Sequence, residues 1–218
     1  MIALLLLLGT NRALWSADAP TANAAAAPRG RIVILGDSIT AGYGLDPGQA
    51  YPALLQRKVD AAGLPFTVIN AGVSGDTTAG GLRRVDWVLA RGADVLIVAL
   101  GGNDGLRGIP PKQTEENLTG IIQRARAKLP SIAVVVVGME MPANLGQEFV
   151  AQFRAVFPRV AGGTQSALVP FLLEGVGGVP TLNQADQIHP TAEGQKRVAE
   201  NVWKGLERIL TTRSAPQK

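Results

Sequence analysis

Five short runs of aliphatic residues recur along the chain, and none of them alternates between apolar and polar side chains. A strand that is apolar on both faces must be covered on both faces, as in a parallel sheet between two layers of helices. An antiparallel sheet with one face exposed to solvent would instead need strands in which apolar and polar residues alternate. The runs occupy residues 31–35, 66–69, 94–100, 132–137 and 167–169.

Amphipathic stretches separate these runs and predict helices over residues 50–62, 78–91, 114–128, 146–161 and 191–210. The third should begin at Thr114, with acidic residues in its first turn, and end before Pro130. Alternating strands and helices predict an α/β fold: a three-layer α/β/α sandwich with a doubly wound, five-stranded parallel sheet. We expect one domain over residues 30–211, preceded by a leader (1–29) and followed by a short tail (212–218).

The composition excludes several classes of protein. Hydrophobic residues make up 46% of the chain and charged residues 17%, which is typical of a folded domain and not of a disordered one. The net charge is +4, but the basic residues are scattered and only two tyrosines are present, so we expect no nucleic-acid partner. Absence of cysteine excludes disulfides, thiolate nucleophiles and cysteine-ligated zinc. Arg83 and Arg84 are expected to be solvated, and Trp87 and Trp203 to pack against the core.

The first residues are typical of an export signal. Residues 2–8 form an apolar run that is much shorter than the roughly 20 residues of a bilayer span, but has the length of a signal-peptide core. Small residues at 17–19 and 22–24 provide candidate cleavage sites, although no Lys or Arg precedes the run. We therefore expect a periplasmic or secreted protein; the alternative is an uncleaved apolar tail.

Segments rich in glycine and small polar residues follow the first three predicted strands, at 36–42, 70–76 and 101–105. In an open parallel sheet, ligands bind outside the carboxyl ends of the strands, so these segments are candidates for the site. Each one alone is equally typical of a tight turn. The first could also bind a phosphate, but neither of the glycine-rich nucleotide-binding motifs follows the first strand.

Three aspartates in these segments, Asp37, Asp76 and Asp104, could be taken for a metal-binding cluster. Carboxylates beside small turns more often cap helices or accept bonds from loop amides. We therefore expect these residues to stabilise the turns, and we expect neither a metal nor another cofactor.

The chain has one histidine, His189, which follows the fifth predicted strand and has Asp186 three residues before it and Pro190 directly after it. A single histidine is by default a surface or structural residue. Here the Asp186 carboxylate could orient the imidazole by accepting a bond from one ring nitrogen. The other nitrogen could then take a proton from a serine.

The candidate segments together resemble the SGNH/GDSL hydrolases, whose four sequence blocks occur here in order between about residues 31 and 210. The matching residues are Gly36-Asp37-Ser38, Gly75, Gly101-Gly102-Asn103-Asp104 and Asp186-x-x-His189. Residues 101–108 and 141–144 look like the bacterial acyl-CoA thioesterase, arylesterase and lysophospholipase subgroup in particular. The resemblance implies a flavodoxin-like fold and a cofactor-free esterase acting on small-molecule or lipid acyl esters and thioesters. It also leads us to expect a monomer with at most transient lipid contact.

The resemblance further implies a role for each matching residue. Ser38 would be the nucleophile, His189 the general base and then the general acid, and Asp186 the residue that orients the imidazole. The oxyanion hole would be formed by the backbone amides of Ser38 and Gly75 and by the side-chain amide of Asn103.

Two methionines after the fourth predicted strand, Met139 and Met141, could line an acyl pocket, because flexible thioethers adapt to varied chains, or could simply belong to the core. Two other functions stay open. The same residues would serve a carbohydrate O-acetylesterase, although 5% aromatic residues offer little for a sugar-stacking groove. A non-catalytic module could bind an anion at residues 36–38, since a fold alone does not establish catalysis.

Overall fold

The aliphatic runs form one five-stranded sheet in the computed structural model, which describes residues 30–214. The strand order is β2-β1-β3-β4-β5, and every neighbouring pair is parallel, as predicted. At the carboxyl edge, Gly36 at the end of β1 pairs with Gly72 of β2 and with Ala99 of β3. The strands are β1 (Gly30–Gly36), β2 (Phe66–Gly72), β3 (Val95–Ala99), β4 (Ala133–Val137) and β5 (Ala167–Val169).

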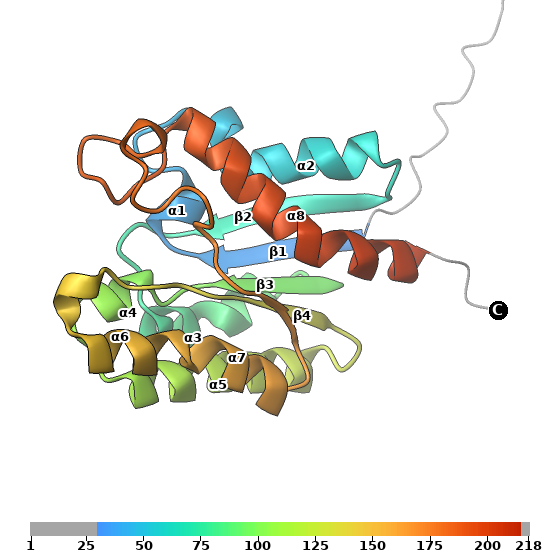
Figure 1. Ribbon diagram of the computed structural model, residues 1–218. Coiled ribbons are helices and arrows are strands. Elements are labelled where there is room, and N and C mark those ends of the chain that lie inside the picture. The colour runs from blue at the N-terminus through green and yellow to red at the C-terminus, as the bar shows by residue number, and fades with distance from the viewer. Residues whose placement is uncertain (1–29, 215–218) are drawn as a thin grey trace, which may run out of the picture.

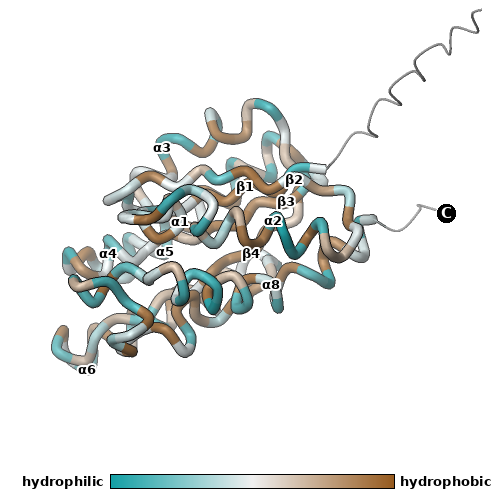
Figure 2. Tube along the Cα trace, turned by 90° about the horizontal axis from the view of Figure 1, so that it is seen from above, coloured by the Kyte–Doolittle hydropathy of each residue, from teal (hydrophilic) through white to brown (hydrophobic). Residues whose placement is uncertain are grey.

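Helices cover both faces of this sheet (Figure 1), so the predicted three-layer sandwich is confirmed. One face carries α2 (Tyr51–Ala61) and α8 (Ala192–Ser214). The other carries α3 (Thr78–Val88), α5 (Pro111–Lys128), α6 (Gln147–Arg154) and α7 (Val156–Gly163). Every residue of β3 is buried, and Figure 2 shows hydrophobic segments along the central strands and hydrophilic ones on the outer helices.

Short helices occupy the turns at the sheet edge. The helices α1 (Ser38–Ala41) and α4 (Gly102–Leu106) follow β1 and β3 directly, where the sequence predicted only turns. Within residues 30–214, three 3₁₀ helices complete the loops: η1 (Pro47–Gln49), η2 (Ala143–Leu145) and η3 (Pro180–Leu182). Among the described residues, no helix combines the length and apolarity that crossing a bilayer requires.

Proline accounts for two of the differences between the predicted and observed helix boundaries. Helix α5 begins at Pro111 and not at Thr114, because proline has a helical φ and needs no hydrogen-bond acceptor at the first position. The helix predicted over 146–161 is two helices that meet at Ala155. Pro158 has no N–H to donate to the carbonyl of Arg154, so the helical hydrogen-bond ladder is interrupted there.

The last helix extends to Ser214, beyond the end at Leu210 that the sequence predicted. The predicted leader, including its apolar run and candidate cleavage sites, lies outside the described residues, as do the last four residues of the chain.

Candidate active site

The candidate site lies where the chain order of the sheet reverses. From β1 the chain passes to β2 on one side, and from β2 it returns to β3 on the other. Such a switch point leaves a crevice at the carboxyl ends of the two central strands, which is where doubly wound folds bind ligands. Ser38 follows β1 and Asn103 follows β3, so the fold places both beside this crevice.

A tight turn between β1 and α1 positions Ser38. Asp37 caps the short helix, since its carboxylate accepts a hydrogen bond from the N–H of Ile39 at 3.0 Å. Gly36 is required on steric grounds, because a Cβ there would lie 2.0 Å from the hydroxyl oxygen of Thr40. Ser38 becomes the first residue of α1, where its backbone N–H has no acceptor within the helix.

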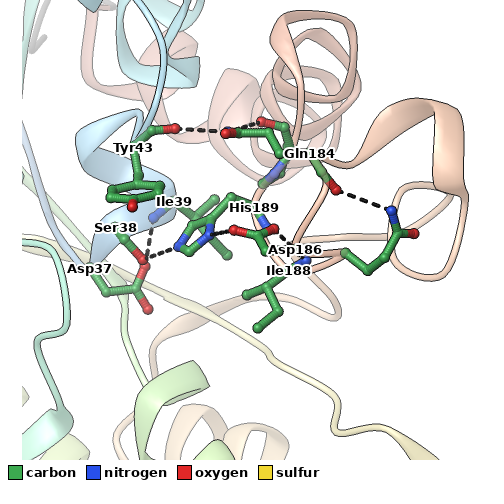
Figure 3. Close-up of polar contacts among 10 residues, drawn as sticks. Asp37, Ser38, Ile39, Tyr43, Gln184, Asp186, Ile188 and His189 are labelled. Carbon is green, nitrogen blue, oxygen red and sulfur yellow. Dashed lines mark hydrogen bonds and ion pairs between the residues drawn. The ribbon is translucent and has the colours of Figure 1, made fainter.

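His189 joins Ser38 and Asp186 in one chain of hydrogen bonds (Figure 3). Its Nε2 lies 2.9 Å from the Ser38 Oγ, across a separation of 151 residues in sequence. Its Nδ1 lies 2.6 Å from the Asp186 Oδ2. An ionised carboxylate can only accept, so Nδ1 carries the proton and Nε2 is free to accept from the serine hydroxyl. The structure therefore brings together the three residues that the sequence nominated.

Asp186 is held as a carboxylate by its own loop. Its Oδ1 accepts the backbone N–H groups of Ile188 at 2.9 Å and His189 at 3.0 Å. These bonds and the one to the imidazole lower the pKa of Asp186 from 3.8 to about 2, the backbone bond from His189 contributing most. Asp186 can therefore orient the imidazole over the whole pH range in which the protein is expected to work.

Gln184 connects the histidine loop to the segment after α1 (Figure 3). Its side-chain amide donates to the carbonyls of Tyr43 at 2.8 Å and Pro190 at 3.0 Å, and its backbone N–H donates to the carbonyl of His189 at 2.7 Å. The Tyr43 ring packs against the imidazole, with centroids 4.6 Å apart. The sequence analysis missed both residues, because glutamine and tyrosine in polar loops have no characteristic spacing.

Two of the predicted oxyanion-hole residues, Gly75 and Asn103, are connected through Asp76. The Asn103 side-chain amide donates one hydrogen bond to the carbonyl of Asp76 at 2.9 Å, which leaves its second hydrogen available. Gly75, next to Asp76, has a φ of 77°, and Arg107 donates to its carbonyl at 3.0 Å. A left-handed φ favours glycine, which accounts for the residue type at position 75.

The three aspartates considered as a metal cluster each make other contacts, and Asp37 and Asp104 accept backbone N–H groups as the turn interpretation predicted, whereas Asp76 pairs with an arginine side chain. Asp37 caps α1, Asp76 pairs with Arg84 at 2.7 Å, and Asp104 accepts both the N–H and the hydroxyl of Thr78. Burial raises the pKa of Asp37 from 3.8 to about 6 and also raises that of Asp104. Within residues 30–214, no group of three or more His, Asp or Glu side chains is arranged to hold a metal ion.

A cavity of about 550 Å³ opens beside Ser38, His189 and Asn103. Met139 and Met141 line it while being only 6% and 8% exposed, so they belong both to the core and to the cavity wall. The other large apolar side chains of the wall are Ile39, Leu106, Phe171, Leu173 and Ile188. A cavity of this size and polarity, with a few polar groups at one end, is typical of small-molecule sites.

Comparison with known proteins places the chain in a family. Residues 34–197 match the model of the GDSL-like Lipase/Acylhydrolase family, which is well over half of the chain. The chain belongs to this family. It is 46% identical to Esterase TesA of Pseudomonas aeruginosa, over 82% of this chain and 89% of the relative. It is 37% identical to Thioesterase 1/protease 1/lysophospholipase L1 of Escherichia coli, over 85% of this chain and 87% of that protein.

Solved structures agree with the family membership. The psychrotrophic esterase EstA from Pseudoalteromonas sp., in a structure inhibited by monoethylphosphonate, matches with a TM-score of 0.78 and 31% identity. The match covers 84% of this chain and 99% of that one. The SGNH resemblance found in the sequence is therefore confirmed, and so is its fold.

Two further expectations were wrong in this GDSL domain. Arg84 is not solvated: its side chain is 18% exposed and reaches the ends of β1 and β2. Trp87 does not pack against the core: it is 79% exposed on α3, whereas Trp203 packs against the core as expected. The only sequence signal for Arg84 is the aspartate eight residues earlier, a spacing too common to be diagnostic.

Proposed function

We propose that this protein is a serine hydrolase that cleaves carboxylic esters and thioesters through an acyl-enzyme on Ser38. The observation that carries the proposal is the position of His189, whose two ring nitrogens contact the Ser38 hydroxyl and the Asp186 carboxylate. An imidazole fixed in this way can activate a serine, because the serine hydroxyl on its own is a weak nucleophile.

In the first half-reaction, the Ser38 Oγ attacks the acyl carbonyl carbon while the His189 Nε2 takes the hydroxyl proton. The resulting imidazolium is stabilised by Asp186. The negative oxygen of the tetrahedral intermediate would accept hydrogen bonds from the backbone N–H groups of Ser38 and Gly75 and from the side-chain amide of Asn103. When the intermediate collapses, the bond to the alcohol or thiol breaks and the leaving group takes the proton from His189.

Water completes the cycle in the second half-reaction. His189 takes a proton from the water as its oxygen attacks the acyl carbon of the Ser38 ester, and the same oxyanion donors stabilise the second intermediate. Collapse returns the proton to the Ser38 Oγ and releases the carboxylic acid. Apart from the substrate and this water, the two half-reactions use only the side chains and backbone amides named above.

The shape of the cavity favours acyl chains over polar sugars. Apolar side chains, including Met139 and Met141, form most of its wall, and among the described residues that line it Phe171 is the one Phe, Tyr or Trp on which a sugar could stack. The relatives named as esterase and as thioesterase and lysophospholipase make esters and thioesters of aliphatic acids the substrates to test first. We propose Met139 and Met141 as residues that contact the acyl chain.

The proposal is tested by reacting the protein with a fluorophosphonate probe, which labels only an activated serine. We expect stoichiometric labelling and hydrolysis of p-nitrophenyl esters, both abolished in Ser38→Ala and unchanged in Ser131→Ala, an exposed serine between α5 and β4. Hydrolysis that persists in Ser38→Ala would refute the assignment. A panel of p-nitrophenyl esters and acyl-CoAs of graded length then resolves the substrate, and a sharp preference for acetyl would favour the O-acetylesterase instead.

We also propose that the protein acts outside the cytoplasm, because residues 2–8 and the small residues that follow have the pattern of a signal peptide. Fractionation of expressing cells, with N-terminal sequencing of the mature chain, tests this. Full-length protein that stays in the cytoplasm would contradict it. We expect a monomer with only transient lipid contact, which light scattering and vesicle co-sedimentation check.

A further inference from the structure

Arg84 of α3 makes three hydrogen bonds to three different parts of the carboxyl edge of the sheet. Its Nη2 donates to the carbonyl of Gly36 at the end of β1, at 2.9 Å, and its Nη1 to the carbonyl of Ala71 near the end of β2, at 2.7 Å. Its Nε donates to the Asp76 carboxylate at 2.7 Å. The guanidinium therefore joins the strand before the nucleophile to the strand before the Gly75 turn.

Asp76 continues this connection to Asn103. Its side chain is 10% exposed and faces Arg84, and the close packing against α3 requires glycine at position 80, where a Cβ would lie 1.7 Å from the Asp76 Oδ1. The backbone carbonyl of the same residue accepts one hydrogen of the Asn103 amide at 2.9 Å. Fixing Asp76 thus also fixes the plane of the Asn103 amide and the direction of its second hydrogen.

We propose that Arg84 is a positioning residue for the oxyanion hole, acting through Asp76 on Asn103. The inference rests on the proposed function, since it assigns Arg84 to the support of that same reaction. Arg84 does not line the cavity, so it is not expected to contact the substrate.

The shape of the guanidinium is what this role needs. Arginine presents several donors in a rigid planar fork, whereas lysine has one ammonium group on a flexible stem that cannot reach three separate acceptors in fixed directions. Oxyanion donors act on the transition state and must already be in place when charge develops. Loosening them should therefore lower kcat and leave KM nearly unchanged.

The experiment compares Arg84→Lys, Arg84→Met and Asp76→Asn with the matched controls Arg83→Lys and Arg83→Met, which change the adjacent exposed arginine. Asp76→Asn keeps the backbone carbonyl that accepts from Asn103 and replaces the carboxylate that pairs with Arg84 by a neutral amide. We expect kcat to fall about 10- to 100-fold in the three test variants, with KM within about twofold, because small displacements of preorganised donors cost this much. The controls should retain the wild-type kcat and KM.

A double-mutant cycle separates positioning from general stability. Asn103→Ala alone should lower kcat about 10²- to 10³-fold. If Arg84 acts through Asn103, Arg84→Lys should lower kcat less than about threefold further in that background, because the donor it positions is gone. Thermal melting of every variant establishes the folded fraction at the assay temperature, and Arg84→Lys provides a mild change if Arg84→Met unfolds.

Three results would overturn the inference: an unchanged kcat in Arg84→Lys and Asp76→Asn, a loss of the same size with and without Asn103, or a loss explained by the folded fraction. None of these affects the assignment of Ser38, which is decided separately by fluorophosphonate labelling of the wild-type protein. Conversely, if the wild-type protein is neither labelled nor active, the proposed function fails before Arg84 is tested.

Discussion

The phenol ring of Tyr43 lies against the imidazole of His189, with centroids 4.6 Å apart and planes inclined by 38°. An aromatic face stabilises a cation, so the ring favours the imidazolium that forms when His189 takes the serine proton. Tyr43→Leu should lower kcat about two- to fivefold, the equivalent of about 0.5–1 kcal/mol. Steady-state kinetics measure this change. Tyr43→Phe keeps the ring and should behave as wild type; an equal loss of kcat in Tyr43→Phe would exclude this role of the ring.

Asp186→Asn should lower kcat about 10²- to 10⁴-fold at every pH, because an amide neither stabilises the imidazolium nor enforces the tautomer. The pKa of Asp186 is lowered to about 2, so the carboxylate stays ionised well below neutral pH. The titration of Asp186 itself should therefore cause no change in the kcat of the wild-type protein above pH 4. Steady-state kinetics from pH 4 to 9 check both points, and a variant within twofold of wild type would contradict the proposed role.

Asp37 should make stability depend on pH. Burial raises its pKa from 3.8 to about 6, so the folded state holds its proton more tightly than the unfolded chain does. Stability is then lost as pH rises from about 3.8 to about 6, by on the order of 3 kcal/mol. Asp37→Asn removes the charge and keeps an acceptor for the Ile39 N–H. The free energy of unfolding of Asp37→Asn, relative to that of the wild-type protein, should therefore be higher at pH 8 than at pH 4 by up to about 3 kcal/mol. Urea denaturation at both pH values measures this, and equal effects would refute it.

Gly177 offers a way to change acyl-chain preference. It lines the cavity, and an added Cβ would make ordinary contacts with Phe171 at 3.5 Å and Leu173 at 3.6 Å. Gly178 is less suitable, because its φ of 75° would strain any other residue. Gly177→Leu should fill part of the cavity. It should lower kcat/KM for long acyl chains at least tenfold relative to acetyl, because a long chain would lose the apolar contacts of a few methylene groups. An unchanged length profile would show that the acyl chain lies elsewhere.

The three layers of the fold, and the edge of the sheet at which the site lies, could be predicted from local sequence patterns. Apolar runs without alternation require cover on both faces, and this alone leads to the parallel sheet. Glycine-rich segments after the strands then mark the carboxyl edge. Ser38 and His189 could be nominated because their blocks occur in a known order. The helix ends at Pro111 and Ala155 could have been read from proline, whose effects are also local.

The directions of individual side chains were decided by the tertiary structure. Arg83 and Arg84 are adjacent on one helix, yet only Arg84 turns toward the sheet edge, because the carbonyls of Gly36 and Ala71 and the Asp76 carboxylate meet there after folding. Trp87 is exposed because its side of α3 faces away from the sheet and the neighbouring helices. Sequence periodicity records how much apolar surface a helix must bury, whereas hydrogen-bond partners far apart in the chain exist only once the strands are assembled.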